Sequence, residues 1–110
     1  MIFDKHGLIT IVSQEKTSLP VFLENLDKAY PKLKNDHIII DLFTFDSLKA
    51  GDILEFLQLS DKHRAAKKSF VLVTDKVNYE SVPDRISVVP TLQEAKDIVE
   101  MEEIERDLGI

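Results

Sequence analysis

The sequence predicts an α/β domain with a mixed, largely parallel sheet of about four to five strands, an N-terminal hairpin and about three helices. Apolar, β-branched runs at residues 37–42 and 70–73 are too short for helices and suit strands that are covered on both faces. Longer segments with apolar residues at helical spacing lie between and after these runs. Strands that alternate with helices form parallel sheets with right-handed crossovers, which gives the fold class.

The N-terminal region predicts a β-hairpin. Short β-rich runs at residues 1–4 and 8–12 flank the tripeptide Lys5-His6-Gly7. Gly7 supplies a backbone angle that a tight turn requires and that other residues resist. We therefore expect the chain to begin with two antiparallel strands.

A helix is predicted to follow the hairpin. Ser18 can cap its N-terminus, Pro20 fits its first turn, and Pro31 is expected to end it. Its apolar face is formed by residues that recur at helical spacing, namely Phe22, Leu23, Leu26, Ala29 and Tyr30.

A second helix is expected over residues 48–66, after the apolar run at residues 37–42. Asp46 or Ser47 is available as its N-cap. Its predicted buried side holds Ile53, Phe56, Leu57 and Leu59.

The C-terminal region predicts a short strand and an acidic helix. Residues 74–85 show no sustained period, whereas residues 86–89 resemble a strand. Thr91 and Glu94 have the spacing of a capping box, in which each side chain satisfies the other residue's free amide, and Gly109 can end the helix. The apolar residues of this helix, expected at about residues 91–108, are Leu92, Ala95, Ile98, Val99, Met101, Ile104 and Leu108.

Composition predicts one domain spanning residues 1–110. Of its 110 residues, 44% are apolar and 31% charged, so the chain has enough core-forming material to fold without crosslinks. The absence of cysteine excludes disulfides, thiolate metal sites and cysteine nucleophiles. No leader-like or membrane-spanning apolar segment is apparent. We therefore expect a soluble cytoplasmic protein without membrane contact.

The net charge of −6 is concentrated near the C-terminus: residues 1–90 carry −1 and residues 91–110 carry −5. Nucleic acid is therefore an unfavourable partner, because binding to phosphates depends on Lys and Arg. The basic segment KHRAAKK at residues 62–68 leaves an RNA-processing accessory role as an alternative. The interpretation that we favour is that this segment complements the carbonyl end of the second helix.

No catalytic or metal-binding motif is apparent. His6, His37 and His63 lie in three different predicted elements without the spacing of a zinc site or a zinc nuclease, and we expect surface or strand-end imidazoles. The three glycines are isolated, so phosphate-binding glycine loops are absent. These features predict a protein that is not an enzyme, holds no metal and needs no cofactor.

Acidic and hydroxyl side chains gather where the predicted strands end. They are Asp41, Asp46, Ser47, Asp52, Thr74 and Asp75. Ligand sites of open α/β sheets lie at the carboxyl ends of strands, so a small-ligand or divalent-cation site is another alternative. The pattern favours helix caps and turn formers over such a site.

Several segments together resemble the STAS domain, the fold of anti-sigma factor antagonists. They are IIIDL at residues 38–42, SFVLVT at residues 69–74 and VVPTLQEA at residues 88–95, with KHRAAKK ending the helix between the first two. In that family, a strand ending in Asp-Leu-Ser leads into a turn of the type x-Asp-Ser-Ser-Gly-Leu, a helix, a buried strand and a last helix opened by Thr/Ser-x-x-Glu-Ala. The resemblance covers nearly the whole chain and implies a STAS-like fold and a non-enzymatic bacterial regulator.

The family's phosphorylated turn is altered in this sequence. Aligned without gaps from Asp41, Phe43 stands at the serine that ends the strand motif. Lys49-Ala50-Gly51-Asp52 stands at the family's Asp-Ser-Ser-Gly, which places Ala50 at the serine that a partner kinase phosphorylates. The resemblance therefore implies a divergent member without the usual phosphorylation switch.

The resemblance also implies a surface for a protein partner. An anti-sigma factor, a kinase or another regulator is expected to dock on the turn at residues 43–52 and on the following helix. The expected site residues are Asp41, Phe43, Thr44, Asp46, Ser47, Ala50, Gly51 and Asp52. Ser47 and Thr44 are the remaining candidates for phosphorylation, and the added charge beside Asp46 and Asp52 would repel an acidic partner.

The apolar residues of the acidic C-terminal helix have two interpretations. The helical spacing favours a stripe that packs on the sheet along its whole length while the carboxylates face water. The alternative is that Met101, Ile104 and Leu108 run past the sheet and meet a partner or a second copy of the chain, forming a homodimer.

Overall fold

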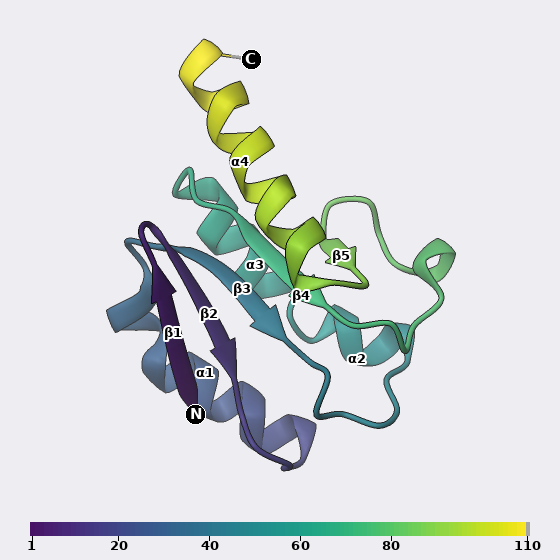
Figure 1. The fold of residues 1–110 in the computed structure, drawn as a ribbon. Helices are drawn as coiled ribbons and strands as arrows, with labels where there is room; N and C mark the ends of the chain where they lie inside the picture. Colours follow the sequence, from purple (N-terminus) through teal and green to yellow (C-terminus); the bar gives the residue numbers. More distant parts are fainter. Residues whose placement is uncertain (110) are drawn as a thin grey trace.

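A computed structural model describes residues 1–109 as one five-stranded sheet with helices on both faces (Figure 1). The elements are β1 (Ile2–His6), β2 (Ile9–Ser13), α1 (Leu19–Leu33), β3 (His37–Asp41), α2 (Ala50–Leu54), α3 (Leu57–Ala65), β4 (Phe70–Val73), the 3-10 helix η1 (Tyr79–Ser81), β5 (Ser87–Val89) and α4 (Leu92–Leu108). The strand order is β1-β2-β3-β4-β5, with β1 antiparallel to β2 and all other neighbours parallel. The predicted fold class is confirmed.

The predicted N-terminal hairpin is present as β1 and β2. Gly7 has a φ of +61° in the turn between them. All residues of β1 are exposed, and β1 forms one edge of the sheet. This strand therefore extends the sheet without contributing to the core.

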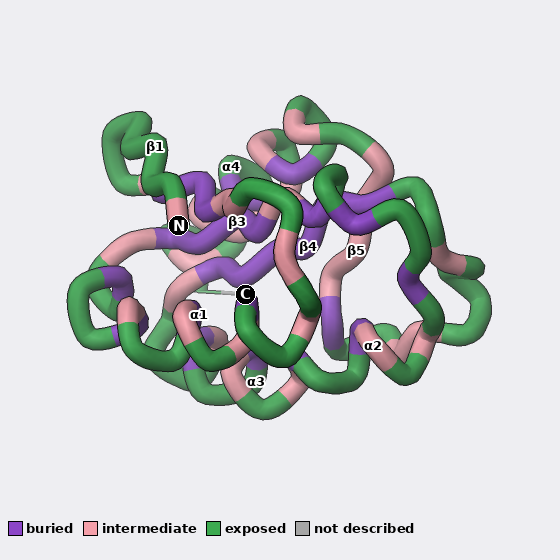
Figure 2. Tube along the Cα trace, turned by 90° about the horizontal axis from the view of Figure 1, so that it is seen from below, coloured by how far each residue is buried: buried purple, intermediate pink, exposed green. Residues whose placement is uncertain are grey.

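The core has two apolar clusters, one on each face of the sheet, because successive side chains of a strand point to opposite faces. Ile38 and Ile40 of β3 pack with α1, α2 and α3, whereas Ile39 packs with Ala95 and Val99 of α4. Figure 2 shows the buried residues concentrated along the central strands. The result is a three-layer arrangement with α4 alone on its face (Figure 1).

The first helix is longer than predicted. The Oγ of Ser18 accepts a hydrogen bond from the backbone N–H of Val21 at 3.4 Å, as expected of the N-cap, and Pro20 lies in the first turn. The prediction that Pro31 ends α1 is wrong, because the helix continues to Leu33. Leu33 is buried in the core, and this burial stabilises the last turn although Pro31 lacks an N–H donor.

The predicted second helix is two helices, α2 and α3. The N–H groups of Glu55 and Phe56 bond to carbonyls three residues earlier, a tighter geometry than that of an α-helix, at the point where Phe56 is completely buried. The prediction of Asp46 or Ser47 as the N-cap is also wrong. The cap is Lys49, whose N–H donates to the Asp52 carboxylate at 2.9 Å.

The last helix begins and ends as predicted. The Oγ1 of Thr91 accepts from the N–H of Glu94 at 3.1 Å, and Gly109 ends α4 with a φ of +74°. The reciprocal half of the capping box differs, because the Glu94 carboxylate accepts from the Thr91 hydroxyl. Within residues 1–109, no helix is long and apolar enough to span a membrane.

Candidate functional site

The predicted partner surface lies at the carboxyl end of β3, in the loop that leads to α2. Leu42, Phe45 and Leu48 are buried and anchor this loop at every third residue. The ring of Phe45 packs edge-to-face on Phe22 of α1, with centroids 5.7 Å apart. The loop therefore has a fixed position on the core. We call residues 43–52 the β3–α2 turn.

Two carboxylates of the predicted site close the ends of this loop. The Oδ1 of Asp41 accepts the N–H of Phe43 at 3.0 Å, and Asp52 accepts the N–H of Lys49. Asp41 and Asp52 therefore act as turn formers in the structure. Asp46 is exposed and lies 3.4 Å from the Nζ of Lys16.

The side chains between these anchors are exposed, and exposed residues continue into α2. Phe43 is 43% exposed, and Leu54, at the end of α2, is 45% exposed. Thr44, Ser47 and Gly51 are exposed as well, and Ala50 is partly exposed at the first position of α2. The structure thus brings the predicted residues together on one short segment that combines a large apolar side chain with hydroxyl groups.

The strand-end carboxylates do not converge on a shared point. Asp75, which follows β4, pairs with Lys76 at 3.3 Å, while Thr74 is buried and its Oγ1 accepts the N–H of Lys76. Across residues 1–109, no group of three metal-ligating side chains is close enough to hold an ion.

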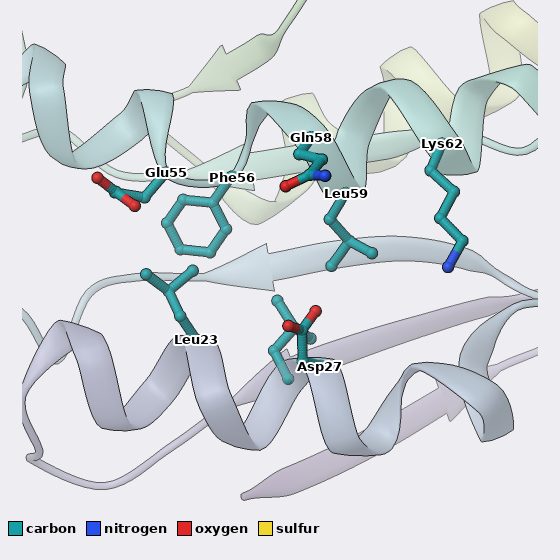
Figure 3. A pocket seen from close by; sticks show the side chains of 8 residues that line it. Leu23, Asp27, Glu55, Phe56, Gln58, Leu59 and Lys62 are labelled. Atoms are coloured by element: carbon teal, nitrogen blue, oxygen red, sulfur yellow. The ribbon is translucent and has the colours of Figure 1, made fainter.

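A groove of about 380 Å³ lies between α1 and α3 (Figure 3). Leu23 and Leu26 of α1 line one wall, and Phe56 and Leu59 line the other. Its polar lining residues are Asp27, Glu55, Gln58 and Lys62. Because Glu55 directly follows α2, the groove begins where the β3–α2 turn and its short helix end.

A buried histidine lies near the opposite end of the sheet. The Nδ1 of His63 bonds with the hydroxyl of Tyr30 at 2.8 Å, and its Nε2 bonds with the carbonyl of Asp36 at 2.7 Å. A carbonyl only accepts, so Nε2 donates; burial favours the neutral ring, in which Nδ1 accepts from the Tyr30 hydroxyl. Burial lowers the pKa of His63. The prediction of a surface or strand-end imidazole is therefore wrong for this residue.

A polar cluster binds α4 to the amino ends of β3 and β4. It consists of His37, Arg64, Ser69, Glu102, Glu103 and Arg106, which we call the α4 clasp. Glu102 accepts from Arg64 and from the Ser69 hydroxyl, both at 2.6 Å, and Arg106 donates to Ser69 at 3.0 Å. Burial raises the pKa of Glu102, but hydrogen bonds from Arg64 and Ser69 and the charges of the arginines outweigh it and lower the pKa below its usual value.

Sequence reasoning missed the clasp, although a signal for it exists. Glu102 and Arg106 continue the spacing of Ala95 and Val99, so they lie on the inner face of α4. The prediction that the apolar stripe packs on the sheet along its whole length is wrong. Met101, Ile104 and Leu108 are 55%, 59% and 67% exposed.

Solved structures with the same fold are STAS-domain proteins. A Ser-to-Glu variant of RsbS from Moorella thermoacetica has a TM-score of 0.65 and 17% identity over 90% of this chain and 93% of that chain. A chain of the stressosome, a signal integration and transduction hub, has a TM-score of 0.59 and 16% identity over 90% and 96%. A candidate anti-sigma factor antagonist from Thermotoga maritima has a TM-score of 0.61 and 15% identity over 90% and 93%.

No family model and no curated protein matches the chain in sequence. The structural likeness nevertheless extends over nine-tenths of the chain. It confirms the STAS-like fold that the sequence motifs predicted.

Proposed function

We propose that this chain is a non-enzymatic STAS-like regulatory module, similar to anti-sigma factor antagonists, that docks a protein partner on the β3–α2 turn. The exposure of Phe43 on a loop anchored by Phe45 and Leu48 carries this proposal. An aromatic side chain on a preordered loop can enter a partner's pocket with little further loss of conformational freedom. The likeness to RsbS and to an anti-sigma factor antagonist supports a regulatory role in the bacterial cytoplasm.

The groove between α1 and α3 extends this surface. Only Leu23 and Leu59 present apolar surface in the groove, because Leu26 and Phe56 are fully buried beneath it, and the rest of its lining offers both signs of charge through Asp27, Glu55 and Lys62. The partner thus contacts the turn, α2 and the start of α3. Such a continuous surface fits an anti-sigma factor, a kinase or another folded regulator.

Control by phosphorylation falls to Ser47 or Thr44, because Ala50 replaces the serine implied by the resemblance. Both hydroxyl residues are exposed and accessible to a kinase. A phosphate on Ser47 would add a charge of about −1.5 to −2 beside Asp46. This charge would release an acidic partner. Mass spectrometry of the protein from its native host checks the switch, and an unmodified turn under all growth conditions removes it.

The docking proposal is tested by affinity capture from the native host with quantitative mass spectrometry. Wild-type chain is compared with Phe43→Ser and Leu54→Ser, and Leu8→Ser is the matched control because Leu8 is 63% exposed in the hairpin turn. We expect a partner that is retained by wild type and Leu8→Ser and lost from both Phe43→Ser, in the turn, and Leu54→Ser, at the end of α2. Equal capture by all four proteins would refute docking at the turn.

No observation favours the alternative functions. Asp41, Asp46 and Asp75 each bond within the chain, which leaves no cluster ready for a cation. In the basic segment, Arg64 binds Glu102 and His63 is buried, so residues 62–68 do not form one continuous exposed basic surface. An increase in melting temperature with Mg²⁺ or Mn²⁺, or salt-sensitive RNA binding, would revive the corresponding alternative.

A further inference from the structure

The C-terminal half of α4 has two opposite faces. At about 100° per residue, Met101, Ile104 and Leu108 fall within an arc of about 60°, and its centre is about 180° from the side occupied by Ala95 and Val99. We call these three apolar residues the outer stripe. Beyond Val99 the inner face of α4 is polar and carries the clasp residues Glu102 and Arg106. In this part of the helix, apolar residues occur only on the outer face, which no part of residues 1–109 covers.

The clasp presents the outer stripe in a fixed orientation. Glu102 and Glu103 hold the helix from one side through Arg64, Ser69 and His37. Figure 1 shows that the last turns of α4 extend beyond the sheet. A helix that is already formed and oriented loses little conformational entropy when a partner packs against it.

The outer stripe has the spacing of a coiled-coil seam. Met101, Ile104 and Leu108 occupy positions a, d and a of a heptad. The flanking e and g positions are Glu100, Glu105 and Asp107, which are exposed and have no ion-pair partner within residues 1–109. Every flanking position beside the stripe from Glu100 to Leu108 is therefore acidic.

This charge pattern decides between a second copy and a different partner. A parallel pair of α4 helices would place Glu100 against Glu105 of the other copy, and an antiparallel pair would place the e positions together and the g positions together. Both arrangements bring carboxylates face to face. We infer that the outer stripe binds a helix of another protein whose apolar a and d residues are flanked by Lys or Arg. This surface lies at the opposite end of the sheet from the β3–α2 turn and does not depend on the proposed function.

A charge-reversed variant of this chain can serve as a model for a partner helix with basic flanks. The variant Glu100→Lys/Glu105→Lys/Asp107→Lys keeps the stripe and supplies basic flanks near a helix C-terminus, where Lys is favourable. We expect wild type and the variant to be monomers when measured separately by sedimentation equilibrium. Their mixture should form a 1:1 complex with an association constant about 10-fold or more above that of wild type with itself, decreasing as salt is raised.

Stripe substitutions provide the controls. Ile104→Ser in the wild-type partner should abolish the mixed complex, whereas Val21→Ser, an exposed apolar position on α1, should retain it. Circular dichroism and melting temperature verify that each protein is folded. Absence of the mixed complex would overturn the inference. Self-association of wild type that Ile104→Ser removes would also overturn it and make a second copy the occupant.

Discussion

His37 at the start of β3 and Glu103 of α4 are joined by a 2.6 Å contact between Nε2 and a carboxylate oxygen. The Nδ1 of the same ring accepts the backbone N–H of Ser69 at 2.9 Å, so Nδ1 carries no proton and Nε2 donates. The ring is therefore neutral when α4 is docked. Burial lowers the pKa of His37 and outweighs the opposing effect of Glu103; Arg106 and Lys68 lower it further.

Acid is expected to destabilise the fold through His37 and His63, because both pKa values are lowered in the folded chain. Below a pH of about 6.5 the unfolded chain binds protons that the folded chain excludes, so the free energy of unfolding falls as pH falls. The slope is at most about 1.4 kcal/mol per pH unit for each histidine. Below about pH 4.5, Glu102 adds a further loss, because its pKa is lowered and its charged form is stabilised by folding.

Urea unfolding between pH 7.5 and pH 5.5 measures this dependence. His37→Gln should reduce the slope, because a glutamine side chain in the same place does not titrate in this pH range. A slope that is the same in wild type and His37→Gln would contradict the role given to the His37 ring.

Removal of the Tyr30 hydroxyl should destabilise the core. Tyr30→Phe leaves the Nδ1 of His63 without a donor in a fully buried position, which costs about 1 to 3 kcal/mol. Tyr79→Phe is the matched control, because the Tyr79 hydroxyl donates to the Thr74 carbonyl at 2.6 Å from a side chain on the surface. Denaturant midpoints should show a clearly larger loss for Tyr30→Phe, and equal losses would be inconsistent with the buried bond.

Substitutions of Phe45 and Phe43, which lie in the same loop, should have different effects on the free energy of unfolding. Phe45→Ala removes a ring that packs on Phe22 and should cost about 3 to 5 kcal/mol. Phe43→Ala, at a position 43% exposed, should lower the free energy of unfolding by only about 1 kcal/mol, because much of the ring already faces water. Thermal and denaturant unfolding check both values. A large loss in Phe43→Ala would mean that this ring supports the fold and is not free for a partner.

Loss of the Glu102 carboxylate should loosen the end of α4. Glu102→Ala removes the acceptor for Arg64 and Ser69, and we expect a loss of about 1 to 2 kcal/mol because the site is partly exposed. Amide hydrogen exchange should accelerate over residues 101–108 while β3 stays protected. Glu105→Ala, at an exposed position, should preserve the wild-type exchange pattern, and matching patterns for the two variants would count against the clasp.

Short apolar runs and glycines at turns and helix ends predicted most of the fold. The buried runs at residues 37–42 and 70–73, the turn at Gly7 and the stop at Gly109 each have one physical interpretation, and all appear in the structure. The exact ends of the helices were less predictable, because local propensity and tertiary packing compete there. Pro31 disfavours a helix, but the burial of Leu33 outweighs it, and the helix break before α3 follows from packing of Phe56 that a periodicity cannot reveal.

The candidate site was predictable in position but not in detail. The resemblance located the turn, whereas the buried positions of Phe45 and Leu48 depend on α1, which is distant in sequence. His63 was assigned to a surface or strand end because its partners, Tyr30 and the carbonyl of Asp36, meet it only through the tertiary fold. The clasp was missed because all carboxylates of the acidic C-terminal helix were predicted to face water.

β3 starts in the clasp, at His37, and ends at Asp41 beside the β3–α2 turn. Its four residue steps separate the two ends by about 13 Å. The three isoleucines between them have no exposed surface, so the strand has no free space in which to slide or bend. Occupancy of one end should therefore leave the geometry of the other unchanged. We expect two partners bound at opposite ends to contribute additive binding free energies, with neither altering the affinity for the other.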